Sequence, residues 1–327
     1  MAEKLNGNDA PLAGVQQELI SAHFLLLRRV LLKSARTDFQ GFMPQNQMER
    51  RVIFTLFRME ESRVSELAYS MGNDVAQISR ALASLRNVGM VHRERQRDPY
   101  TLTAKGLKFG QELDAVAEKR EQRLIRGLQP VEAFELGGML MSLQNRASQI
   151  LAEELLQAKT EDAGEEGITV PAYPDPPNRV QAAVFNIANT ISRSATAAFK
   201  RLAGVSNFEW RVLVNVASRP SITFMGIVDH VDADKAQVSR TLDALVGVGL
   251  ICRAKDAASG QVLIELTEKG QAYYALMRDD ALKRHTILTA GLKNAQRGRL
   301  QGYLNLLIGN ALEMAGMSGE QEDRHGL

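Results

Sequence analysis

Side chains that are able to contact nucleic acid recur at matching positions in two parts of this 327-residue chain. Each part carries a glutamine, a serine and an arginine in the same spacing: Gln77, Ser79 and Arg80, and then Gln237, Ser239 and Arg240. An arginine can bind a guanine edge or a phosphate, a glutamine amide can read adenine, and a serine hydroxyl can donate to phosphate. The duplicated set therefore predicts two DNA contacts.

Each of these side chains also has a purely structural explanation. An exposed arginine is often simply solvated, and a helix serine often bonds to its own backbone. Gln77 lies three residues after Asp74, so the two could form a capping box at the start of a helix. The duplication favours DNA contact for the two arginines. For the serines and the glutamines, both explanations stay open. They also stay open for Lys235, which is a candidate for phosphate contact.

A second group of basic residues follows the first of these segments. Arg93, Arg95 and Arg97 alternate in an extended stretch, where they could enter a narrow minor groove or merely protect an edge strand. Arg253 is the corresponding candidate at the start of the second hairpin. The tip of that hairpin, Ala258 to Gly260, contains no arginine, which puts minor-groove contact there in doubt.

Charge is distributed unevenly between the two parts, although the whole chain is only +2. From Gln77 to Lys108 there are seven basic and two acidic residues, which gives +5, whereas from Gln237 to Lys269 there are four of each. Because phosphate contacts dominate affinity for DNA, we expect the first part to bind DNA more strongly. We also expect a target site that is less palindromic than those of homodimers.

The segments that must position these residues are copies of each other. Residues 74–93 and 234–253 align without gaps at a shift of 160, with 10 of 20 positions identical, and an L-T-x-K-G segment follows each. A proline-rich, acidic stretch separates the copies and is typical of a linker. The predicted boundaries are a first domain at 12–157, a linker at 158–179, a second domain at 180–316 and a tail at 317–327.

Apolar spacing within each copy predicts a helix-turn-helix followed by a hairpin, which is a winged helix. Val75, Ile78, Leu82 and Leu85 form one helical stripe, so we expect reading helices at about 74–88 and 234–248. Long helical segments flank the two copies, with breaks near Pro130 and Gly291: 16–37, 105–156, 180–202 and 268–315. The predicted fold class is mainly α with small β-wings (α+β), in which two winged helices share a helical scaffold.

Here the sequence resembles the MarR family of bacterial winged-helix transcription regulators. The similar segments are N-F-E-W-R-V-L at 207–213, A-Q-V-S-R-x-L-x-x-L at 236–245, L-T-E-K-G at 266–270, and their counterparts in the first copy, Q-I-S-R-A-L at 77–82 and L-T-A-K-G at 102–106. Family wings commonly carry an Asp-x-Arg-Arg type of tip. The first wing departs from that pattern with Asp98-Pro99, and the second with Ala258-Ser259-Gly260.

The resemblance implies several properties that the residue spacing does not show. Family members are usually homodimers of one such unit, so it implies a tandem fusion whose halves pair within the chain as a pseudo-twofold dimer. Each half would place one reading helix in a major groove of double-stranded DNA, about one helical turn apart. It also implies a repressor released by a small-molecule effector, often an aromatic acid; no residue here identifies that effector.

Other chemistry is poorly supported by the sequence. Five scattered histidines show no metal-ligand spacing, and no catalytic set or Gly-rich phosphate loop is recognisable, so we expect neither an enzyme nor a cofactor. Cys252 is the only cysteine and is expected to be a small buried strand residue, and Met139 and Met141 are expected to fill a helical core. No membrane span or signal peptide is evident, which predicts a cytoplasmic protein. An alternative function is a ligand-sensing or protein-interaction scaffold that has weakened or lost DNA binding.

Overall fold

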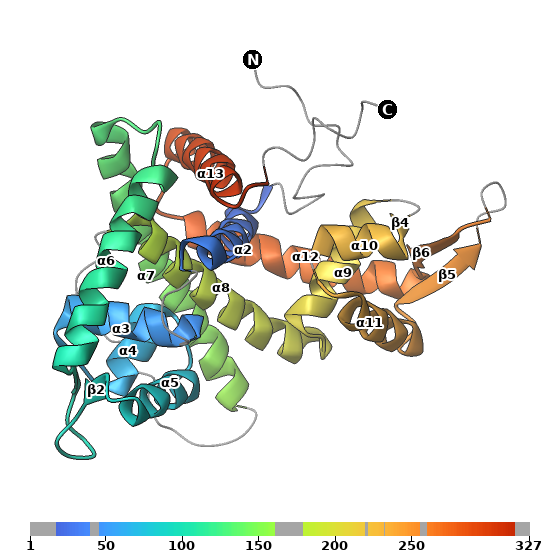
Figure 1. Cartoon of the computed structure of the whole chain (residues 1–327). Coiled ribbons are helices and arrows are strands. Elements are labelled where there is room, and N and C mark those ends of the chain that lie inside the picture. Colours follow the sequence, from blue (N-terminus) through green and yellow to red (C-terminus); the bar gives the residue numbers. More distant parts are fainter. Residues whose placement is uncertain are drawn as a thin grey trace, which may run out of the picture. The chain divides into compact units, whose positions relative to one another are not determined.

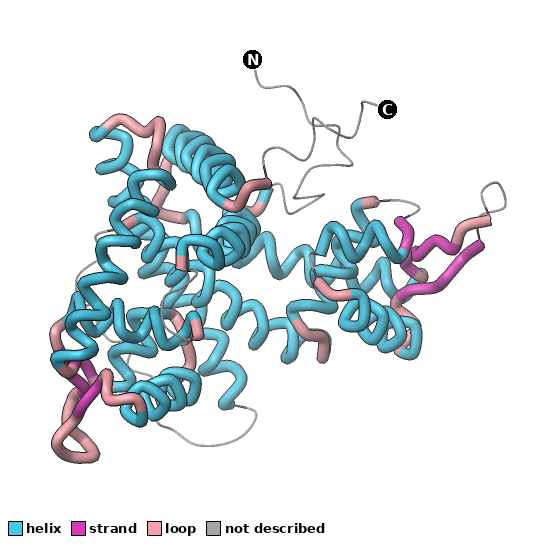
Figure 2. The backbone as a smooth tube through the Cα atoms, viewed as in Figure 1, coloured by secondary structure: helices cyan, strands magenta, loops and turns pink. Residues whose placement is uncertain are grey.

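The computed structural model describes residues 18–39, 46–160, 179–219, 222–231, 233–255 and 260–317, which are mainly helical with two small antiparallel sheets (Figures 1 and 2). The chain divides into two compact units, each assembled from three stretches. Residues 24–149, 167–191 and 291–327 form what we call the first unit. Residues 1–23, 150–166 and 192–290 form the second unit.

The first unit contains a complete winged helix. Its elements are α3 (Gln47–Met59), β1 (Glu61–Ser62), α4 (Val64–Met71), α5 (Val75–Asn87), β2 (Val91–His92), β3 (Tyr100–Leu102) and α6 (Ala104–Leu124). The strands pair in the order β1-β3-β2, with Ser62 opposite Tyr100 and Val91 opposite Leu102. Side chains from α3, α4 and α5 meet in one core, which includes Ile53, Leu56, Leu67, Ile78, Leu82 and Leu85.

Local sequence explains where the helices of this winged helix begin and end. Gly72 has a φ of 64° and ends α4, a left-handed conformation that residues with a Cβ rarely adopt. Two residues later, the Asp74 carboxylate accepts the Gln77 backbone N–H at 2.7 Å and begins α5. The predicted capping box is wrong, however, because the Gln77 side chain does not return to Asp74 but accepts a hydrogen bond from Asn73 at 2.9 Å.

The predicted apolar stripe of α5 is confirmed at three of its four positions. Ile78, Leu82 and Leu85 are fully buried, whereas Val75 is 54% exposed. Val75 is the first residue of the helix, where the chain has only just left the turn, so its side chain does not reach the core. The core-facing stripe therefore begins one turn later than its spacing predicts.

The second unit repeats this order of elements. They are α9 (Asn207–Ser218), β4 (Ile222–Thr223), α10 (Phe224–Val231), α11 (Lys235–Gly247), β5 (Ile251–Lys255), β6 (Val262–Leu266) and α12 (Glu268–Thr289). Its sheet has the order β4-β6-β5, and Ile251 lies opposite Leu266. Trp210 anchors the core, with its ring centroid 5.6 Å from those of both Phe199 and Tyr274.

Long helices complete the two units: α2 (Ile20–Asp38), α7 (Pro130–Thr160), α8 (Val180–Ala203) and α13 (Asn294–Met314). The predicted breaks are confirmed, since α6 and α7 separate before Pro130 and α12 and α13 separate around Gly291. Of the two methionines expected in the core, Met139 is buried, but Met141 is 46% exposed because it lies on the outer face of α7. The expectation for Met141 is therefore wrong.

The sequence copies and the compact units do not coincide. Helices α2, α7 and α8 each contribute residues to both units, and α13 belongs to the first unit although it closes the second copy. The predicted linker overlaps the end of α7 at 158–160, and its residues 161–178 lie outside the described residues, as do 318–327 of the tail. The predicted domain boundaries and the pseudo-twofold arrangement stay predictions.

Buried polar contacts join the long helices of the first unit. The Arg120 guanidinium of α6 is almost fully buried, forms an ion pair with Asp38 of α2 and donates to the Ser34 hydroxyl at 2.8 Å. Glu121, on the same helix, accepts the backbone N–H groups of Val180 and Gln181 at 2.6 and 3.1 Å, so its carboxylate caps the start of α8. Burial raises the pKa of this carboxyl, despite these two hydrogen bonds.

Candidate nucleic-acid interface

The reading helix of the first unit, α5, turns its predicted DNA-contacting residues to solvent. Gln77, Ser79 and Arg80 are all exposed, on the side opposite the buried Ile78 and Leu82. Within the described residues, the Arg80 guanidinium takes part in no ion pair and the Ser79 hydroxyl makes no hydrogen bond to the helix. The donors that could contact a phosphate or a base edge are thus available on this face.

The corresponding face of α11 is similar but less open. Arg240 and Lys235 are exposed, whereas Gln237 and Ser239 are half-buried. Lys235 is the first residue of the helix, where the helix dipole disfavours a positive charge. Its ammonium group is exposed at the start of the helix, where a phosphate could be contacted.

The first wing differs from the predicted alternation of arginines along a strand. β2 ends at His92, so Arg93, Arg95 and Arg97 all lie in the loop before β3. The loop is held by its own contacts: Asp98 accepts the backbone N–H of Arg95 at 2.9 Å, and Arg93 donates to the Gln96 carbonyl at 2.7 Å. The wing arginines are thus loop side chains rather than a charged strand edge.

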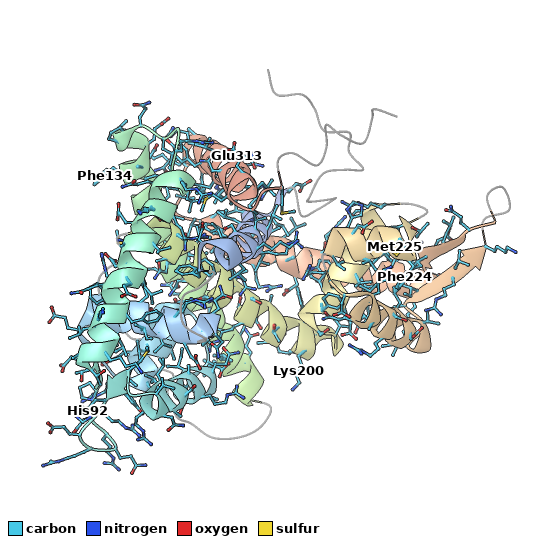
Figure 3. All side chains as sticks on the ribbon, in the orientation of Figure 1. His92, Phe134, Lys200, Phe224, Met225 and Glu313 are labelled. Atoms are coloured by element: carbon cyan, nitrogen blue, oxygen red, sulfur yellow. The ribbon has the colours of Figure 1, made fainter. Side chains whose placement is uncertain are left out.

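These contacts divide the three wing arginines into two kinds. The Arg93 guanidinium also lies over the Tyr100 ring, 4.7 Å from its centroid, which draws this side chain back onto the wing. Arg95 and Arg97 remain exposed. In Figure 3 the side chains of this loop extend outward beyond the labelled His92. Arg95 and Arg97 are therefore the better placed of the three to reach a groove.

The second wing has longer strands than the first, and the positive charge of the arginine at its base is paired with a carboxylate. The Arg253 guanidinium of β5 pairs with the Asp243 carboxylate of α11 at 2.6 Å, and both side chains are exposed. The first unit has Ala83 at the position of Asp243, so Arg93 has no such partner there. The predicted residues Ala258 and Ser259 at the wing tip lie outside the described residues.

Cys252 was expected to be buried, and this expectation is wrong. The residue lies on β5 but is exposed, because the burial pattern of that strand places Ile251 inward and the next side chain outward. Its partner in register is Glu265 of β6. The thiol therefore belongs to the outer face of the second wing.

The L-T-x-K-G segments join each wing to its reading helix. In the first unit, Thr103 caps α6 and its hydroxyl donates to the Gly89 carbonyl at 2.7 Å, while the Lys105 ammonium donates to the Val88 carbonyl at 3.0 Å. A Cβ on Gly106 would lie 2.1 Å from the Met90 carbonyl oxygen, so only glycine fits there.

The second unit repeats every one of these contacts. Thr267 donates to the Gly249 carbonyl at 2.7 Å and Lys269 to the Val248 carbonyl at 2.8 Å. A Cβ on Gly270 would lie 1.9 Å from a backbone oxygen of Leu250. In both units the lysine binds the carbonyl end of the reading helix, so the segment fixes the angle at which the wing leaves that helix.

An arginine at matching positions of the two copies, which was not among the predicted site residues, binds the turn of the helix-turn-helix in each unit. Arg51 of α3 donates to the Met71 carbonyl at 3.0 Å, and Arg211 of α9 donates to the equivalent Val231 carbonyl. The available signal was that Arg51 and Arg211 stand at the same shift of 160 residues that relates the two copies. Asn186 and Asn189 of α8 also donate to carbonyls at the end of α4, and no sequence pattern pointed to them.

No protein-family model matches the sequence, and a search of the curated proteins finds no match. Among solved structures, a MarR/EmrR family transcriptional regulator from Acinetobacter sp. ADP1 is similar, with 27% identity over 39% of this chain and 90% of that one, and a TM-score of 0.35.

Two further solved structures show a comparable likeness. Wild-type MarR from E. coli, in its apo form, is 22% identical over 35% of this chain and 85% of its own, with a TM-score of 0.32. A probable transcriptional regulator from Pseudomonas aeruginosa is 22% identical over 35% and 87%, with a TM-score of 0.31.

Two other kinds of feature are absent from the described part of the chain. No helix in it is long and apolar enough to cross a membrane. No group of three or more His, Cys, Asp or Glu side chains in it could hold a metal ion.

Proposed function

We propose that this protein is a sequence-specific DNA-binding transcription regulator that inserts α5 and α11 into major grooves of double-stranded DNA. The observation that carries the proposal is the pair of exposed arginines, Arg80 and Arg240, at the same position of the second helix of two helix-turn-helix motifs. A helix in this position normally reads base edges while the flanking segments hold the backbone.

The proposed roles follow from the donors on the outer faces of the two reading helices and on the first wing. Arg80 and Arg240 contact guanine edges or phosphates, Ser79 and Ser239 donate to phosphates, and Lys235 contacts a phosphate at the start of α11. Arg95 and Arg97 supply a minor-groove or backbone contact from the first wing. The second wing contributes less, because Arg253 is already paired with Asp243.

The proposal has a regulatory part that rests on the family resemblance of the sequence. The two halves pair within one chain about a pseudo-twofold axis, the protein acts in the cytoplasm as a repressor, and a small aromatic acid releases it from DNA. None of these roles requires catalysis or a cofactor by the protein.

Titration of the intact protein with DNA from its own upstream region, at 50 and 200 mM salt, tests the proposal. We expect specific binding that weakens steeply with salt, as phosphate contacts require. Addition of small aromatic acids is expected to lower the affinity. Absence of specific binding at both salt concentrations would contradict the proposal.

A second candidate function is favoured by the Asp243–Arg253 ion pair. A neutralised second reading face fits a sensor or protein-interaction scaffold in which DNA binding has weakened. The same titration separates the two, since a scaffold would show no preference for the upstream DNA over unrelated DNA of equal length.

A further inference from the structure

Gln77 on the reading face of the first unit is the last member of a hydrogen-bonded chain that starts inside the unit. The Arg51 guanidinium donates to the Asn73 side-chain oxygen at 3.4 Å, and the Asn73 amide nitrogen donates to the Gln77 side-chain oxygen at 2.9 Å. Arg51 is itself held by the Met71 carbonyl at 3.0 Å. This series of hydrogen bonds thus connects α3, through the loop between α4 and α5, to the first turn of α5.

The direction of these hydrogen bonds is fixed by chemistry. A guanidinium has only donors, so the Asn73 amide must turn its oxygen to Arg51 and its NH₂ group to Gln77. Gln77 must then offer its oxygen to Asn73. Its own NH₂ group is left facing the exposed side of α5, where a base edge would lie.

A second amide, that of Asn189, binds the same turn and favours the same orientation of the Asn73 amide. The Asn189 oxygen accepts from Arg28 at 2.6 Å, so its NH₂ group points to the Met71 carbonyl at 2.9 Å and to the Asn73 oxygen at 3.4 Å. Arg28 and Arg51 are both donor-only groups. Together they prevent the Asn73 amide from rotating by 180°.

We propose that Asn73 is a positioning residue that sets the base preference of the first reading helix. By engaging the Gln77 oxygen, it presents the Gln77 NH₂ group as the reading edge, which pairs with a base acceptor: N7 or O6 of guanine, O4 of thymine, or, through a single hydrogen bond, N7 of adenine. Bidentate reading of adenine requires the glutamine oxygen as well, and that oxygen is already bound. This inference rests on the proposed DNA-binding function.

The second unit lacks this device and provides the internal comparison. Ala233 stands at the position of Asn73, and among the described residues no side chain hydrogen-bonds to the Gln237 amide. Gln237 can therefore turn either amide atom outward and read adenine with both. We therefore expect the two halves of the target site to differ at the base that the glutamine contacts. The base at Gln77 presents an acceptor, and the base at Gln237 is adenine.

Replacement of Asn73 by aspartate reverses the direction of the hydrogen bond to Gln77, while the side chain keeps almost the same shape. The new carboxylate still accepts from Arg51 but cannot donate, so Gln77 turns its NH₂ group inward and exposes its oxygen. Competition between target sites carrying each of the four bases at the Gln77 position, located with Gln77→Ala, measures the effect. We expect the preference to move from guanine or thymine to adenine or cytosine, with relative affinities changing about tenfold.

Three controls keep the test decisive. Asn73→Ala should relax the preference without inverting it, and Ala233→Asn should create the guanine or thymine preference in the second half-site. The added charge of Asn73→Asp lowers affinity for all four sites alike, so the ranking of bases is the readout. If the Asn73 variants do not fold, Ala233→Asn decides alone.

The outcomes separate this inference from the function on which it rests. An unchanged base ranking in folded Asn73→Asp, or in Ala233→Asn, overturns the positioning role while leaving DNA binding intact. Failure of the unaltered chain to prefer any sequence contradicts the proposed function itself.

Discussion

The ion pair between Asp243 and Arg253 predicts that the second half can be made to bind DNA more tightly by removing one acid. Asp243→Ala reproduces Ala83 of the first unit and frees the Arg253 guanidinium, which is now 2.6 Å from the carboxylate. The stretch from Gln237 to Lys269 then changes from neutral to +1. If the freed guanidinium takes up one phosphate, the slope of log K against log salt steepens by about 0.9.

That slope sets the size of the expected effect. A fourfold rise in salt, from 50 to 200 mM, would weaken the Asp243→Ala variant about 3.5-fold more than the unaltered chain. Fluorescence anisotropy with a labelled duplex at four or more salt concentrations resolves such a change. The duplex should be the specific site, so that both halves are engaged.

A matched variant distinguishes a local contact from a general gain of charge. Asp279 is also exposed and paired with an arginine, Arg278, at 3.5 Å, but it lies on α12 of the same unit, outside the reading face. Asp279→Ala makes the same change in net charge and should leave the slope unaltered. Equal effects of the two substitutions, or an unchanged slope in Asp243→Ala, would refute the idea that Asp243 withholds Arg253 from DNA.

Three further predictions follow from the two units. Arg80→Ala should weaken specific binding more than Arg240→Ala, because the first half carries the larger positive charge; equal losses on a symmetric site would contradict this asymmetry. Gly106→Ala should destabilise the fold by about 3 kcal/mol or more in chemical denaturation, since its Cβ would lie 2.1 Å from a carbonyl oxygen of the wing. As a control, Gly137→Ala should stabilise the fold by about 0.5–1 kcal/mol, because Gly137 has open space around it on α7. The raised pKa of Glu121 means that the folded state binds this proton more tightly, so stability falls as pH rises from about 4.5 through the folded pKa; Glu121→Gln should remove that part of the pH dependence of Tm.

The sequence was sufficient to predict the elements of the winged helices because their determinants are local. Asp74 and Asp234 both cap reading helices, and Gly72 ends the helix before the first of them, as their spacing indicates. Because each pattern occurs in both copies of the sequence, each predicted element was supported twice. What repeats in sequence also repeats in structure, down to the lysine that binds the end of each reading helix.

The misjudged residues depend on neighbours that no local pattern reveals. The sequence suggested that the Gln77 side chain either caps α5 or contacts a base, whereas its oxygen accepts a hydrogen bond from Asn73, whose amide is oriented by Arg51 and Asn189 from other helices. Cys252 was judged by its residue type, whereas the register of β5 decides which side chains face outward. The assignment of Arg253 to DNA did not anticipate Asp243, which lies ten residues earlier but one helix away.

The interleaving of the two units has a consequence for how the chain matures during synthesis. The first unit requires α13, whose buried Asn310 donates to the Leu124 and Arg126 carbonyls at 2.8 Å each. At about 5–20 residues per second, a ribosome needs roughly 10–30 s to extend the chain from the middle of α7 to the end of α13. Throughout that interval the faces of α6 and α7 that α13 will cover remain open, so the nascent first unit must wait for almost the whole protein before its scaffold can close.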